Sequence, residues 1–132
     1  MSLQSFKSDA APILLIEDEP SVIAFLRAAL ERRGYAVDNA ASGAEGLRRL
    51  LGGRYSGVIS DIRMPGAVNG AEVHAWIQQN RPDLGARIIL ISGDTANSET
   101  QALLARSGTP CIAKPFRVQQ LISIVEKTFG KP

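Results

Sequence analysis

Short apolar runs alternate with longer amphipathic segments from one end of the sequence to the other. Several of the short runs are apolar without interruption, which is typical of strands that helices cover on both faces. The weakest run, Tyr35–Val37, is predicted to lie at an edge of the sheet. The pattern predicts five strands, at Ile13–Ile16, Tyr35–Val37, Gly57–Ser60, Arg87–Ile91 and Cys111–Ala113.

Helix start and stop signals bound the amphipathic segments. Pro20 opens the first segment at a position where proline is favoured, and Gly34 closes it. Ser42 and Glu45 have the spacing of a capping box at the start of the second. From these signals and the spacing of the apolar residues we predict helices at 20–33, 43–52, 69–80, 97–106 and 118–129.

The fivefold alternation of strand and helix, with short connections, predicts an α/β fold. Crossovers between parallel strands are right-handed, so few topologies remain. We expect a doubly wound five-stranded parallel sheet in the order 2-1-3-4-5, the flavodoxin-like arrangement. In such sheets ligands bind at the carboxyl ends of the strands, near the switch point between strands 1 and 3. The residues that follow each strand are therefore the first candidates for function.

Length and composition exclude several classes of protein. The 132 residues fit one domain, which we predict over 12–129 after a flexible N-terminal tail at 1–11. The formal net charge of +2 does not indicate a nucleic-acid-binding surface, and no apolar run is long enough to span a membrane. The single cysteine excludes an internal disulfide, and no export signal precedes the first strand. We therefore predict a cytoplasmic protein that binds neither nucleic acid nor membranes.

Carboxylates, a hydroxyl and an amine follow the predicted strands. Glu17 and Asp18 follow the first strand, and Asp61 follows the third. Ser92 and Lys114 follow the fourth and the fifth. Three carboxylates this close would raise one another's pKa unless a cation lay among them, and oxygen ligands in an open cluster suit Mg²⁺. With a lysine and a hydroxyl to hold phosphoryl oxygens, the arrangement supports attack by a carboxylate on phosphorus, which gives an aspartyl phosphate.

Taken one at a time, these residues have ordinary structural interpretations. An acidic residue before a helix is often its N-cap, and Glu19 before Pro20 fits that description. A serine at the end of a strand is commonly a turn residue, and a single lysine is commonly solvated. His74, the single histidine, is expected to be incidental rather than a phosphohistidine, because it lies on a helix of a doubly wound domain. Functional groups at successive strand ends nevertheless favour a site over a series of coincidences.

Four stretches of the sequence carry a resemblance to a known family: Ile13–Pro20, Asp61–Gly66, Ile89–Gly93 and Lys114–Phe116. They resemble the receiver domain of two-component response regulators, and the resemblance extends over about 12–129. It implies that Asp61 accepts a phosphoryl group from a histidine kinase or a histidine phosphotransfer protein, in a Mg²⁺-dependent step. The domain would then shift between inactive and active states, so the resemblance implies a switch rather than a conventional enzyme.

The resemblance also implies roles for the other candidate residues. Ser92 matches the hydroxyl residue that turns toward the phosphoryl group, and Lys114 matches the lysine that pairs with it. The bond between Lys114 and Pro115 is implied to be cis. Asp18 is implied to bind Mg²⁺ directly, and Glu17 to support it. The full set of implied Mg²⁺ ligands is Glu17, Asp18, Asp61 and the backbone carbonyl of Arg63.

Cys111 departs from the family pattern. The family usually has a tyrosine or phenylalanine three residues before the lysine, and its ring swings inward when the domain is phosphorylated. A thiol lacks the reach and bulk of such a ring, so we predict a shallower switch at Ser92 and Cys111. A redox role would need exposure and a lowered pKa, so Cys111 is expected to be a buried, inert strand residue.

The resemblance leaves the context of the domain open. The last predicted helix ends within a few residues of Pro132, so we expect either a stand-alone receiver or one excised from a longer protein. The receiver of a hybrid histidine kinase is the alternative within the family. A homodimer through the fourth and fifth helices is a further expectation, whereas the downstream target is not indicated by any residue.

Two alternatives to a phosphorylated switch fit the sequence less well. An enzyme with an aspartate nucleophile, such as a haloacid-dehalogenase-type phosphatase, needs a second aspartate two positions after the first. Arg63 stands there, and arginine cannot transfer the proton. A degenerate receiver without phosphorylation is disfavoured by the intact residues Asp18, Asp61, Ser92 and Lys114.

Arg63 and Asp94 carry one further hypothesis. Each lies two residues past a candidate site residue, on neighbouring strand ends, and their charges are opposite. An ion pair between them across the mouth of the site would hinder the water that hydrolyses an aspartyl phosphate.

Overall fold

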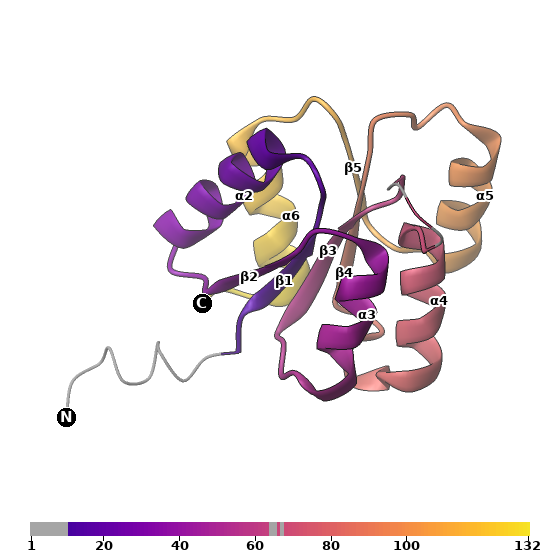
Figure 1. The fold of residues 1–132 in the computed structure, drawn as a ribbon. Helices are drawn as coiled ribbons and strands as arrows, with labels where there is room; N and C mark the ends of the chain where they lie inside the picture. The colour runs from indigo at the N-terminus through magenta and orange to yellow at the C-terminus, as the bar shows by residue number, and fades with distance from the viewer. Residues whose placement is uncertain (1–10, 64–65, 67) are drawn as a thin grey trace.

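The computed structural model describes residues 11–63, 66 and 68–132 (Figure 1). Of the predicted N-terminal tail, 1–10 lies outside the described residues. The strands are β1 (Ile13–Ile16), β2 (Val37–Ala40), β3 (Gly57–Asp61), β4 (Ile88–Ser92) and β5 (Cys111–Ala113). The helices are α2 (Pro20–Arg32), α3 (Gly43–Gly52), α4 (Gly70–Asn80), α5 (Ser98–Ser107) and α6 (Val118–Phe129), with a short 3₁₀ helix, η1 (Pro82–Leu84).

The five strands form one parallel sheet in the order β2-β1-β3-β4-β5, which confirms the predicted topology. In β1, Ile13 pairs with Val37 of β2 on one side and with Gly57 of β3 on the other. Helices α2 and α6 lie on one side of the sheet, and α3, α4 and α5 lie on the other (Figure 1). The five carboxyl ends therefore meet at one edge of the sheet, where chains leave β1 and β3 toward opposite faces.

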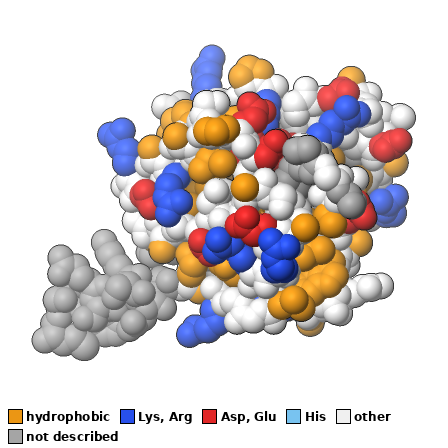
Figure 2. Space-filling view, viewed as in Figure 1, with side chains coloured by type: hydrophobic (Ala, Val, Ile, Leu, Met, Phe, Trp, Pro, Cys, Tyr) orange, Lys and Arg blue, Asp and Glu red, His pale blue; other side chains and the backbone are white. Residues whose placement is uncertain are grey.

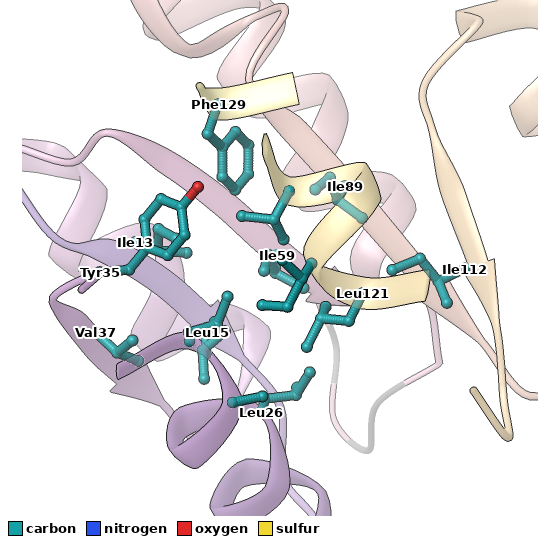
Figure 3. Packing of buried hydrophobic residues seen from close by; sticks show 14 of the residues in the cluster. Ile13, Leu15, Leu26, Tyr35, Val37, Ile59, Ile89, Ile112, Leu121 and Phe129 are labelled. Carbon is teal, nitrogen blue, oxygen red and sulfur yellow. The ribbon is translucent and has the colours of Figure 1, made fainter. Parts of the chain in front are cut away.

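Alternate residues of each strand face opposite layers of the core. Ile13 and Leu15 lie in the cluster beneath α2 and α6, whereas Leu14 lies in the cluster beneath α3 and α4. Figure 3 shows Leu121 of α6 among the strand residues of the first cluster, with Ile59 nearby. Full burial of such a side chain stabilises the fold by about 2 kcal/mol. The two layers together hold the strand ends in a fixed arrangement.

The second strand differs from its prediction. The strand begins at Val37 rather than Tyr35, although it does lie at an edge as expected. Tyr35 is buried because it belongs to the turn after α2, where its hydroxyl donates a hydrogen bond to the carbonyl oxygen of Gly130 at 2.6 Å. The local pattern cannot show a contact with a residue so far along the chain. The apolar run therefore wrongly predicts Tyr35 to be part of the strand.

The predicted helix starts agree with the structure to within one residue. Ser42 accepts a hydrogen bond from the backbone N–H of Glu45, and Asn69 begins α4 with a full capping box. Asn97 accepts from two backbone N–H groups at the start of α5. Glu19 stands at the N-cap position of α2 but makes no side-chain cap hydrogen bond, so its predicted capping role is wrong.

Two large apolar side chains of the helices lie near the surface. Phe25 of α2 is 39% exposed, and Val118 of α6 is 44% exposed. Within the described residues, no helix has the length and apolar character needed to cross a membrane.

Candidate functional site

The carboxyl ends of four strands bring the candidate residues together. Glu17 and Asp18 follow β1, and Asp61 is the last residue of β3. Because Ile16 pairs with Ser60, the residues that follow them lie side by side at the switch point. Ser92 ends β4, and Lys114 follows β5. β1, β3 and β4 are buried along their whole length, and their polar side chains lie at or near the carboxyl ends of the strands.

Lys114 is the centre of the ionic contacts. Its Nζ donates hydrogen bonds to Oδ2 of Asp61 at 2.7 Å and to Oε1 of Glu17 at 3.1 Å. A longer ion pair, at 3.8 Å, joins it to Glu19. Burial alone would lower the pKa of Lys114, but the hydrogen bonds to Asp61 and Glu17 outweigh it and raise that pKa above its usual value. Lys114 therefore stays charged and holds the Asp61 carboxylate in place.

Glu17 is a buried carboxyl group with one oxygen unused. The residue is 1% exposed, and within the described residues its Oε2 has no hydrogen-bond partner. The pKa of Glu17 is raised from 4.5 to about 7, because burial and the neighbouring Asp61 raise it by more than Lys114 lowers it. An orphaned buried oxygen is costly, and a cation that ligates it would remove that cost.

Asp18 completes an acidic group that fits a divalent cation. One carboxylate oxygen from each of Glu17, Asp18 and Asp61 lies within 4.8 Å of the others. Asp18 is half-buried and opens toward solvent, whereas the other two are buried. An all-oxygen donor set with one open side suits Mg²⁺, which keeps several waters and binds through one or two carboxylates. The residues present therefore fit the predicted metal.

The two oxygens of Asp61 have different partners. Oδ2 accepts from Lys114, and Oδ1 accepts from the backbone N–H of Arg63 at 3.1 Å. This contact brings the main chain of Arg63 to the site, although its side chain is exposed. The arrangement fixes the orientation of a carboxylate that is only 6% exposed.

Ser92 is buried at the end of β4, the strand next to that of Asp61. Its Oγ accepts a hydrogen bond from the backbone N–H of Asp94 at 3.0 Å. Its carbonyl oxygen accepts from the backbone N–H of Lys114 at 2.8 Å, so the β4–β5 pairing continues to the level of the site. The bond between Lys114 and Pro115 is cis, as the resemblance implies.

Cys111 is half-buried at the start of β5 and contacts the core cluster beneath α3 and α4. Burial raises the pKa of the Cys111 thiol, and the charge of Asp61 adds to the shift. The thiol is therefore protonated and weakly nucleophilic, which agrees with an inert strand residue more than with a redox sensor. It is less buried than predicted.

At the rim of the site one expectation is wrong and one contact was missed. Arg63 and Asp94 form no ion pair in the part of the chain that the structure describes. The side chain of Arg63 instead lines a groove between the starts of α4 and α5, next to Asn69 and Asn97. Conversely, sequence reasoning missed the approach of Glu19 to Lys114. The acidic run 17–19 was the available signal, but proximity to Pro20 favoured a capping role instead.

Comparison with known proteins decides the family. The sequence model described as "Response regulator receiver domain" matches residues 13–126. The chain belongs to this family. The family match confirms the resemblance, and the strand order confirms the predicted fold. Receiver domains act in two-component systems, where their partners are histidine kinases or phosphotransfer proteins.

Three relatives place this receiver domain more closely. It is 34% identical to the sensor kinase CckA of Brucella abortus over 126 residues, which is 94% of this chain and 13% of CckA. It is 33% identical to the response regulator receiver protein CpdR of Brucella abortus over 115 residues, 87% of this chain and 93% of CpdR. The crystal structure of the receiver domain of a Pseudomonas aeruginosa sensor histidine kinase holds a magnesium ion in its active site cleft. It has a TM-score of 0.79 and 26% identity, and covers 92% of this chain and 99% of that one.

Proposed function

We propose that Asp61 is the phosphoacceptor of this receiver domain and that phosphorylation depends on Mg²⁺ held by Glu17, Asp18, Asp61 and the backbone carbonyl of Arg63. The observation that carries the proposal is the 2.7 Å contact between Lys114 Nζ and Asp61 Oδ2 beside the orphaned oxygen of Glu17. The amine fixes one carboxylate oxygen and offers charge to an incoming phosphoryl group. The magnesium-bound relative supports the same interpretation.

The chain provides the nucleophile and the groups that hold the phosphoryl oxygens, and the partner provides the phosphohistidine. An oxygen of Asp61 attacks the phosphorus of a phosphohistidine on the partner, a P–O bond forms, and the P–N bond breaks. The imidazole leaves and takes up a proton from solvent. Lys114 and the Ser92 hydroxyl would hold phosphoryl oxygens, and Mg²⁺, when bound, offsets the negative charge that gathers there. The domain changes state through this modification, so we assign it no conventional enzymatic activity.

The proposed partner is a histidine kinase or a histidine phosphotransfer protein. Nucleic acid is not a proposed partner, because basic and acidic side chains are interspersed on the face seen in Figure 2 and form no continuous basic strip there. A receiver within a hybrid histidine kinase is the second candidate, favoured by the similarity to CckA. The similarity to CpdR, itself a response regulator receiver protein, agrees with the main proposal. Dimerisation through α5 and α6 and a cytoplasmic location stay predictions.

Intact mass measurement tests the proposal. Incubation with acetyl phosphate and Mg²⁺ is expected to add one phosphoryl group, with the P–O bond to acetate broken and acetate released. Asp61→Asn and chelation of the metal should each abolish the mass gain. Asp94→Asn is the matched control, because Asp94 is an exposed carboxylate near the same edge and should be labelled normally at Asp61. Labelling that survives Asp61→Asn would overturn the assignment.

A further inference from the structure

Helix α5 and the loop after it have few side-chain links to the rest of the domain. The helix buries only Thr100 and Leu103. Across 98–110, the side-chain hydrogen bonds that the structure describes are local caps and turns, with one exception. The exception joins Nε2 of His74, on α4, to Oγ1 of Thr109 at 2.8 Å. A single polar contact therefore ties this segment to its neighbouring helix.

The surroundings of His74 favour one arrangement of protons. The residue is 8% exposed, and the side-chain amide nitrogen of Gln78 lies 3.5 Å from its Nε2. That amide also donates to the carbonyl oxygen of Gly85 at 2.7 Å, which fixes its nitrogen as the donor. In the neutral ring Nε2 can accept from the hydroxyl of Thr109, whereas in the protonated ring Nε2 can only donate. Thr109 can turn its hydroxyl to accept that bond, but the Gln78 amide nitrogen cannot accept, so what opposes the proton is the Gln78 donor together with the burial of the charge.

Charge around His74 also opposes a proton there. Burial lowers the pKa of His74, and the nearby guanidinium of Arg106 on α5 lowers it further. Of the residues lining the hollow beside the ring, contributed by α4, α5 and the loops next to them, only Arg106 carries a permanent charge. The hollow measures about 560 Å³, so the ring has room to leave its site. No carboxylate among these lining residues compensates an imidazolium.

We propose that the hydrogen bond between His74 and Thr109 is a latch that fastens the α5 segment to α4, and that adding a proton to His74 releases it. In the released state the charged ring turns toward solvent, and the segment is held by the packing of Thr100, Leu103 and Leu104 and by the backbone hydrogen bond from Leu90 to Pro110. Because α5 begins shortly after Ser92, the latch also sets the resistance against which phosphorylation at Asp61 would move this segment. That last part rests on the proposed function.

Amide hydrogen exchange of the whole chain tests the latch. In Thr109→Val, which keeps the shape of the side chain and removes the hydroxyl, the α5 amides should exchange about fivefold faster, as expected for one lost hydrogen bond. Thr109→Ser keeps the hydroxyl and should restore slow exchange. Gln101→Ala, an exposed change on α5 away from α4, is the matched control and should leave exchange unchanged. Equal exchange in Thr109→Val and the wild type would overturn the latch.

The pH dependence provides a readout that a purely structural role would not change. His74 is the single histidine, so its ring signals in an NMR titration need no further assignment. As pH falls from 8 to 5, protection of the α5 amides, corrected for intrinsic exchange, should fall in step with the protonation of His74. In His74→Gln this pH dependence should disappear. A titration of His74 without any change in α5 protection would show that the proton does not release the segment.

A phosphoryl mimic tests the coupling to Asp61. With Mg²⁺ and beryllofluoride, α5 exchange in the wild type should change, and the change should be at least twofold smaller in Thr109→Val because the segment is already released. Failure of the wild type to gain mass from acetyl phosphate would defeat the proposed function and leave the latch result standing. Normal labelling with an equal α5 response in both proteins would overturn the regulatory part of the inference.

Discussion

Helices α6 and α5 both follow strands that end at the site, yet the domain holds them in different ways. α6 buries Leu121, Ile122, Val125 and Phe129 against the sheet, and the carbonyl oxygen of Phe129 accepts a hydrogen bond from Arg87 at 2.6 Å. Tyr35 adds a second link to the carbonyl oxygen of Gly130. α5 buries two side chains, and its one described side-chain hydrogen bond to another helix comes from Thr109 in the loop after it. α6 is part of the scaffold, and we expect α5 to change position at a lower cost in free energy.

The difference indicates which segment of this receiver domain can change conformation most easily. Segments with few buried apolar contacts open locally at a free-energy cost well below that of global unfolding. Lys114, which contacts Asp61, is joined to the rigid side through the chain that leads into α6, whereas Ser92 leads into α5. We therefore expect a chemical change at Asp61 to move the α5 side more than the α6 side.

The largest effect should come from truncating a core residue of α6. Leu121→Ala removes a side chain with no exposed surface and is expected to lower the free energy of unfolding by about 3 kcal/mol, measured by urea denaturation. Leu103→Ala in α5 is the matched substitution and should cost about 2 kcal/mol or less, much of it as local opening of α5. Equal losses in the two variants would remove the distinction between the helices.

A second effect concerns Glu17, which contacts Lys114 at the site. Its pKa is raised from 4.5 to about 7, so the stability it contributes is fully present below pH 4.5 and is lost as pH rises through 7. Without metal, Glu17→Gln should therefore stabilise the domain by about 2 kcal/mol at pH 8 and by little at pH 5. Urea midpoints at both pH values, in chelator, measure the difference.

Magnesium provides the control for the Glu17 prediction. At pH 8 the cation should raise the stability of the wild type, whose ionised Glu17 can bind it, more than that of Glu17→Gln. If Glu17→Gln raises the free energy of unfolding in chelator equally at pH 5 and at pH 8, another group causes the pH dependence of the wild type.

Loss of a helix cap should have a smaller effect on stability, and the effect should differ in kind between α5 and α4. Asn97→Ala removes the acceptor for two backbone N–H groups of α5 and should cost about 1 kcal/mol, seen mainly as faster hydrogen exchange within α5. Asn69→Ala breaks the capping box of α4, whose Val73 and Ile77 are buried, so its similar cost should lower the global unfolding midpoint. If Asn97→Ala lowers that midpoint equally, α5 does not open separately.

The smallest change in stability is expected for Cys111→Tyr. The site is half-buried at the edge strand β5, so a ring can extend outward and the stability should change by less than about 0.5 kcal/mol. The ring should instead strengthen the coupling between Asp61 and α5. Hydrogen exchange with and without beryllofluoride and Mg²⁺ is expected to show a larger α5 response than in the wild type, with labelling of Asp61 unchanged. The same response in both proteins would contradict this role for position 111.

Local patterns were enough for the elements and for the composition of the site. Continuous apolar runs gave the buried strands, and Ser42, Asn69 and Asn97 mark helix starts that the structure confirms. The strand-end residues could be named because the topology of a five-stranded α/β sheet places all carboxyl ends at one edge. The error at Tyr35 arose where a distant acceptor, the carbonyl of Gly130, decided the position of the side chain.

The amino-acid sequence by itself determined which groups reach the site, because strand order and direction follow from periodicity and crossover handedness. Only the tertiary structure decided how those groups pair. Lys114 contacts Glu17 and Asp61 from a strand far along the chain, Oε2 of Glu17 is left without a partner, and His74 meets Thr109 across a groove. Side-chain periodicity reports only the face of an element on which a residue lies. Hydrogen-bond partners and pKa values depend on burial and on distances between segments that folding brings together, and no local pattern contains those distances.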